Sequence, residues 1–119
     1  MGIESYENLI VWQKSMDLVV LIYELTNKFP KEEIYGITSQ MRRASVSIPS
    51  NIAEGSRRSS RKDFRNFLLN VYGSGAELET QVKITKRLCF GNEENYKKIE
   101  NLLSEIMRML NKLTSELKD

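Results

Sequence analysis

Residues 60–90 read SRKDFRNFLLNVYGSGAELETQVKITKRLCF, and the spacing of their apolar side chains predicts one long helix. Apolar or small residues recur after alternating steps of four and three, which places them on one face of an α-helix that packs in a left-handed bundle. This row is Phe64, Leu68, Val71, Gly75, Leu78, Val82, Thr85 and Cys89. Ser60 and Asp63 have the spacing of a capped helix start, and Gly91 is predicted to stop the helix.

Residues 9–29 carry two neighbouring apolar rows with the same period, and Asn8 is the expected N-cap. The row expected in the core is Leu9, Trp12, Met16, Val19 and Tyr23. The second row is Val11, Leu18, Ile22, Leu25 and Phe29. Because this apolar arc is wider than one row, we expect the helix to contact its own core and something outside it.

A further helix is predicted over residues 34–55, after the Phe29-Pro30 pair, and it contains Pro49. Proline cannot donate to the Ser45 carbonyl, so the helix either bends or breaks there; a bend is the expectation, with Ser47 available to satisfy the freed groups. Gly55 is expected as a left-handed cap. Glu54 opposes the helix dipole, so we expect an ion pair with Arg58, or with Arg42 or Arg43 upstream.

The last helix is expected to start at Asn92 as its N-cap. Its apolar row is Tyr96, Ile99, Leu103, Ile106, Leu110, Leu113 and Leu117. Four such helices joined by short links predict an all-α, antiparallel up-down-up-down four-helix bundle that is kinked at Pro49. The whole chain, residues 1–119, is expected to be one domain.

Composition narrows the possible functions. The chain contains no histidine, which removes the usual general base, the usual zinc ligand and the Glu-x-x-His pair of di-iron bundles, so we expect neither catalysis, nor a cofactor, nor a metal. Cys89 is the single cysteine, which suits a reducing compartment, and the acidic N-terminus has no leader pattern. The expected location is therefore the cytoplasm, without membrane contact.

Positive charge is concentrated in one part of the chain. Residues 56–90 carry eight basic and three acidic side chains, a net charge of +5, whereas the whole chain has +2. The densest group is Arg57, Arg58, Arg61, Lys62 and Arg65, at the corner between the second and third helices. With Arg42 and Arg43, these residues are predicted to contact phosphates of a nucleic acid. The alternative is ordinary solvated surface charge.

A row of mostly small residues beside the core row of the third helix predicts self-association. The row is Leu69, Gly73, Ala76, Thr80 and Ile84. A monomer is expected to leave this row exposed, together with Val11 and Leu18 of the first helix. The predicted oligomer interface is thus Val11, Leu18, Leu69, Gly73, Ala76 and Ile84.

Several motifs resemble the 23S rRNA intervening-sequence protein family, also called S23 ribosomal proteins or four-helix bundle proteins. They are LIVW at 9–12, Phe29-Pro30, Tyr35-Gly36, SQMRRA at 39–44, SIPSNIAEG at 47–55 and GSGAELETQ at 73–81. The resemblance implies a cytoplasmic bundle that forms homopentamers. The accessory protein of diversity-generating retroelements is similar in fold and binds nucleic acid through a basic surface.

Two functions follow as hypotheses. The leading one is a bacterial homo-oligomer that binds rRNA or another structured nucleic acid through the basic residues. The alternative is a structural adaptor whose oligomer binds a protein partner through the apolar residues of its first and third helices.

Overall fold

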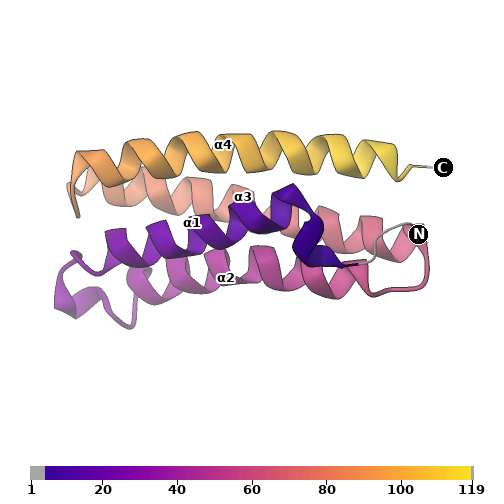
Figure 1. Ribbon diagram of the computed structural model, residues 1–119. Helices are drawn as coiled ribbons and strands as arrows, with labels where there is room; N and C mark the ends of the chain where they lie inside the picture. The colour runs from indigo at the N-terminus through magenta and orange to yellow at the C-terminus, as the bar shows by residue number, and fades with distance from the viewer. Residues whose placement is uncertain (1–4, 119) are drawn as a thin grey trace.

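A computed structural model describes residues 5–118, which form four α-helices, two short 3-10 helices and no strand. The elements are η1 (Tyr6–Asn8), α1 (Ile10–Thr26), η2 (Lys31–Glu33), α2 (Ile37–Ser56), α3 (Arg61–Arg87) and α4 (Glu93–Glu116). Figure 1 shows the four long helices side by side. The predicted all-helical class and the predicted number of helices are confirmed.

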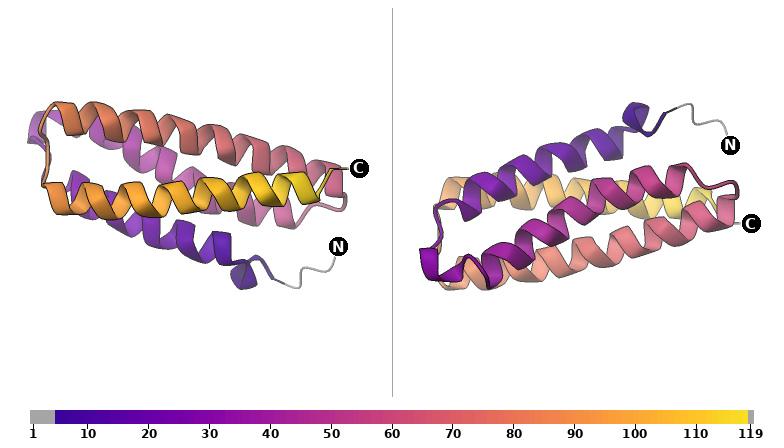
Figure 2. Two further views of the ribbon diagram at one scale, coloured as in Figure 1. Left: turned by 90° about the horizontal axis from the view of Figure 1, so that it is seen from above. Right: turned by 90° about the horizontal axis from the view of Figure 1, so that it is seen from below.

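Each α-helix packs against two others: α1 and α3 both contact α2 and α4. The molecule measures 44 × 24 × 21 Å. In Figures 1 and 2 the link between α2 and α3 lies at the same end as η1 and the end of α4, and the other two links lie at the opposite end. The corner between α2 and α3 therefore lies at the same end of the bundle as the start and the end of the described chain.

The apolar rows predicted for α3 and α4 form the core. Along α3 every member of the row from Phe64 to Thr85 is buried, and along α4 all but the half-buried Leu113 are buried. Cys89 is the exception, because it is exposed and lies beyond the end of α3 with a positive φ of 61°.

Of the row expected in the core of α1, Leu9 and Trp12 are half-buried and pack against the core, and the expectation is wrong for Met16 and Tyr23. Met16 and Tyr23 are 44% and 43% exposed, whereas Val11 and Leu18 of the second row are 3% and 0% exposed. Both rows have the helical period, and only the positions of α2 and α4 decide which row faces inward. Val11 and Leu18 therefore belong to the core of the chain itself, and the expectation that a monomer leaves them exposed is also wrong.

The helix ends agree in part with their predictions. The Ser60 hydroxyl accepts the Asp63 amide N–H at 3.0 Å, and the Asn92 side chain accepts the Asn95 amide N–H at 3.1 Å, so both expected N-caps are confirmed. Asn8 is not a cap of α1, because it ends η1 and Leu9 takes the N-cap position.

The second helix also departs from its prediction at both ends. η2 and Gly36 precede α2, so α2 begins at Ile37 rather than at residue 34. Gly55 lies inside α2, and the C-cap is Arg57 in right-handed geometry, so a left-handed cap at Gly55 is wrong.

Pro49 lies within a continuous α2, so a break at this position is wrong. A bend of the helix axis there stays a prediction. The Ser47 hydroxyl, expected to satisfy groups freed by the proline, donates to the Ala44 carbonyl at 2.7 Å. Among residues 5–118, no helix is both long enough and apolar enough to cross a membrane.

Candidate nucleic-acid interface

The corner between α2 and α3 exposes several cationic side chains in a short stretch. α2 ends at Ser56, and Ser60 caps α3. Arg57 and Arg58 lie in the turn between the helices, Lys62 lies in the first turn of α3, and all three are exposed. None of these three side chains is part of the hydrophobic core.

Arg58 is held by two contacts. Its guanidinium lies 3.2 Å from the Glu54 carboxylate, as the sequence predicted, and its central carbon lies 4.8 Å from the centre of the Phe67 ring. Both partners of the ion pair are about half exposed, so the pair adds little stability. Its main effect is to orient the guanidinium over the ring.

Gly55 makes room for that ring. A Cβ at Gly55 would lie 2.6 Å from the Cβ of Phe67, so only glycine lets the Phe67 side chain approach the backbone of α2 this closely. The glycine that ends the SIPSNIAEG motif therefore serves helix packing, and this packing places an aromatic ring next to Arg58.

Arg57 stacks in a similar way on an aromatic ring of η1. Its guanidinium carbon lies 5.4 Å from the centre of the Tyr6 ring. Tyr6 in turn meets Trp12 edge to face, with ring centres 5.2 Å apart. Two arginine–aromatic stacks thus flank the end of α2, one formed with η1 and one with α3.

Two other arginines of the group bind the end of α4. Arg61 donates to the Glu116 carbonyl at 2.8 Å, and Arg65 donates to the Thr114 carbonyl at 3.2 Å. The last carbonyls of an α-helix have no partner within the helix, so these two side chains stabilise its C-terminus. Arg61 and Arg65 therefore make contacts within the chain itself and are not simply solvated surface charge.

Arg42 and Arg43 do not join the corner. They lie near the start of α2, about 20 Å along the helix from Arg57 at ~1.5 Å per residue. The Arg42 Nε donates to the Thr26 hydroxyl at 2.9 Å, and its guanidinium lies 4.6 Å from the centre of the Tyr23 ring. The seven predicted phosphate contacts are therefore split between two places.

On α3 the predicted interface residues are exposed. Leu69 and Ile84 are 44% and 45% exposed, and Gly73 and Ala76 are exposed between them. A Cβ at Gly73 would meet no atom within 4 Å beyond the neighbouring backbone of its own helix. No part of the described chain therefore covers this row.

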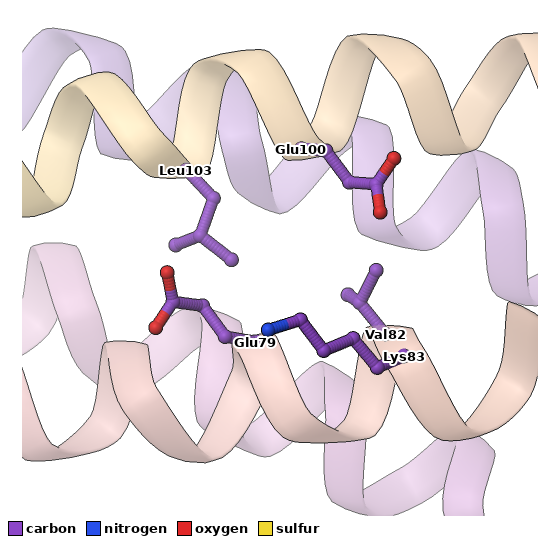
Figure 3. A pocket seen from close by; sticks show the side chains of 5 residues that line it. All are labelled: Glu79, Val82, Lys83, Glu100 and Leu103. Carbon is purple, nitrogen blue, oxygen red and sulfur yellow. The ribbon is translucent and has the colours of Figure 1, made fainter.

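A small hollow between α3 and α4 has a volume of about 180 Å³. Figure 3 shows Glu79, Val82 and Lys83 from α3 facing Glu100 and Leu103 from α4. The Glu100 carboxylate already pairs with Lys86 at 3.1 Å. This hollow is smaller than the ~300 Å³ of typical small-molecule sites. Within residues 5–118, no group of three or more His, Cys, Asp or Glu side chains is placed to hold a metal ion.

Sequence reasoning missed the aromatic half of the corner. Tyr6 precedes the first helix, and Phe67 lies off the core row of α3, so neither fitted the apolar period. The available signal was the position of Phe67 itself, since an aromatic residue outside a core row and near several arginines is a candidate for cation–π contact.

The fold and this corner define a small helical-bundle protein with a basic end. The sequence profile of the 23S rRNA-intervening sequence protein family matches residues 7–112, and the chain therefore belongs to this family, as its motifs predicted. A crystal structure of a protein with unknown function from the S23 ribosomal protein family of Bacteroides thetaiotaomicron is similar, with a TM-score of 0.81 and 28% identity. The match covers 89% of this chain and 96% of that chain. The comparison with curated proteins gives no match.

Proposed function

We propose that this family member is a non-enzymatic, cytoplasmic bacterial protein that binds rRNA or another structured RNA through the corner between α2 and α3. The observation that carries the proposal is the exposure of Arg57, Arg58 and Lys62 within six consecutive residues. Cationic side chains on such a surface neutralise phosphates and release their counterions, which favours binding.

Self-association would strengthen this binding. Exposed apolar residues lie on two different helices: Met16, Val20 and Tyr23 on α1, and Leu69 and Ile84 on α3. If one set contacts the other set on the next copy, the contact is head to tail and can close into a ring, in which the family resemblance implies five copies. The ring would repeat the corner around its axis and enlarge the positive surface.

An adaptor for a protein partner is the second candidate. Ile10 and Val20 on α1 are 57% and 56% exposed, so this helix offers apolar surface to a partner. A protein ligand bound at this helix would not need the basic corner. Its affinity would also depend only weakly on salt, because burial of apolar surface involves no release of counterions.

Charge removal at the corner separates these candidates. We expect the triple variant Arg57→Ala, Arg58→Ala, Lys62→Ala to bind rRNA fragments more weakly. The slope of log K against the logarithm of the salt concentration should become less steep by about 0.7–0.9 for each lost phosphate contact. Fluorescence anisotropy across a range of salt concentrations measures both quantities. The matched control is Lys97→Ala, Lys98→Ala, Arg108→Ala on α4, which removes the same charge from other exposed positions.

An unchanged affinity and salt slope in the corner variant, with assembly intact, would contradict the proposed interface. Equal losses in the corner variant and the control would show that net charge alone matters. Wild-type protein that binds no RNA at low salt would leave the adaptor as the better account.

A further inference from the structure

We infer that the corner binds unpaired nucleotides, whose bases stack on the guanidinium planes of Arg57 and Arg58. This inference rests on the proposed function, because it requires RNA at the corner. It adds the class of RNA that is bound, namely single-stranded segments such as loops, bulges and ends.

Two arginines of the corner lie over aromatic rings. Each guanidinium covers an aromatic ring, at 5.4 Å for Arg57 on Tyr6 and 4.8 Å for Arg58 on Phe67. Both arginines are exposed, so each side chain offers surface to a ligand in addition to its contact with the ring. Nucleobases stack on planes of this kind in RNA-binding proteins.

Neighbouring side chains hold both guanidinium groups in place. Glu54 pairs with Arg58, and the space above Gly55 admits Phe67. On the other side Trp12 supports the Tyr6 ring. Groups that are ordered before binding lose less conformational entropy when the ligand arrives. These arginines are therefore well suited to bind a nucleobase, whose stacking alone gives only weak affinity.

An RNA duplex is a poorer ligand for these arginines than an unpaired strand. In an A-form duplex the base faces are stacked on one another, and side chains reach only phosphates, 2′-hydroxyls and groove edges. A duplex could therefore use the charge of the corner but not its planes. An unpaired strand could use both, and each stacked base is expected to strengthen binding by about tenfold.

The same corner provides a control for charge. Arg61 and Arg65 belong to the same basic group, but they donate to the Glu116 and Thr114 carbonyls, and neither covers an aromatic ring of residues 5–118. Lysine keeps the positive charge and loses the plane. Comparing the exchange of arginine for lysine at positions 57 and 58 with the same exchange at positions 61 and 65 therefore separates stacking from charge.

The experiment measures the affinity of three proteins for a 10-nucleotide single-stranded RNA and for a blunt duplex of the same sequence. Wild type is expected to prefer the single strand. The variant Arg57→Lys, Arg58→Lys should lose about tenfold or more in affinity for the single strand and stay within about twofold for the duplex. The control Arg61→Lys, Arg65→Lys should keep the preference of the wild type.

Two results would overturn the inference. RNA binding without a preference for the single strand, or with equal effects of Arg57→Lys, Arg58→Lys on both RNAs, would reject stacking and leave the proposed RNA-binding function intact. Wild type that binds neither RNA at low salt would reject the function and the inference together.

Discussion

Two glycines within helices, Gly55 and Gly73, differ in their surroundings and should respond in opposite ways to alanine. At Gly55 the added Cβ would lie 2.6 Å from the Cβ of Phe67, an atom fixed to the backbone of α3, so the helices must separate. We expect Gly55→Ala to lower the free energy of unfolding by about 1–3 kcal/mol. At Gly73 the added Cβ would meet nothing within 4 Å beyond the neighbouring backbone of its own helix, and Gly73→Ala should raise this free energy by about 0.5–1 kcal/mol.

Urea denaturation of both variants, at a concentration that gives them the same oligomeric state, measures this difference. A Gly55→Ala protein as stable as the wild type would show that Phe67 does not need the space above α2.

Tyr96 gives a prediction about pH. Its side chain is 2% exposed, and its hydroxyl donates to the Phe90 carbonyl at 2.7 Å. Burial raises the pKa of this phenol above its ordinary value of 10.0. Below pH 10 the phenol is protonated in both folded and unfolded chains; above it the unfolded phenol ionises first, so the stability that Tyr96 contributes falls as pH rises.

The variant Tyr96→Phe should therefore cost about 1–2 kcal/mol at pH 7, where it leaves the Phe90 carbonyl without its donor. Its stability deficit should shrink between pH 10 and pH 11. Lys86, whose pKa is raised by its hydrogen bond to Glu100, also loses its contribution as pH rises above 10.5, equally in both proteins. Denaturation curves at the three pH values test this; a deficit that does not shrink would contradict it.

At the scale of the helix, Arg61 and Arg65 should stabilise the end of α4. They donate to the Glu116 and Thr114 carbonyls. We expect Arg61→Ala, Arg65→Ala to lower the free energy of unfolding by about 1–3 kcal/mol, at roughly 0.5–1.5 kcal/mol for each hydrogen bond. Hydrogen exchange in the last turns of α4 should also accelerate.

The matched variant is Lys83→Ala, Lys97→Ala, which removes the same number of positive charges from exposed side chains that form no ion pair among residues 5–118, and it should change stability by less than about 0.5 kcal/mol. Equal losses in the two variants would show that the contacts with α4 contribute nothing specific.

Pro49 tests whether α2 is bent. Replacing Pro49 by alanine restores an amide N–H that can bond to the Ser45 carbonyl, so a bent helix would straighten. Pro49 is buried and, with Met16 and Val46, borders a shallow groove between α1 and α2. We expect a folded, helical protein with an altered melting temperature and oligomer mass. Circular dichroism and size measurements decide this, and no change in either quantity would leave the bend without a role.

For the whole molecule, the exposed row on α3 predicts assembly. Light scattering at micromolar concentration should give a mass several times that of the 13.8 kDa chain. Ala76 is exposed in the chain, so Ala76→Phe should leave the fold intact and weaken the assembly, because a close helix contact has no room for the ring. A wild-type monomer would reject the assembly. An unchanged oligomer in Ala76→Phe would show that this row faces water.

The core of α3 and α4 was predictable because each helix carries one dominant apolar row, and a helix with one such row can be buried in only one orientation. Ser60 and Asn92 were predictable for a related reason, since a cap acts within a few residues of its own position. Family membership also followed from local motifs, which the sequence profile confirms over residues 7–112.

Contacts between distant segments were decided only by the tertiary structure. The two rows of α1 have equal periods, so Val11 could not be ranked above Trp12 until α2 and α4 were in place. Gly55 matters because of Phe67 on another helix, and Arg61 because of a carbonyl of Glu116, 55 positions away. The sequence by itself determined periods and caps, which depend on neighbours along the chain. The orientation of each helix and the stacks at the corner depend on neighbours in space, and these exist only once the helices have packed.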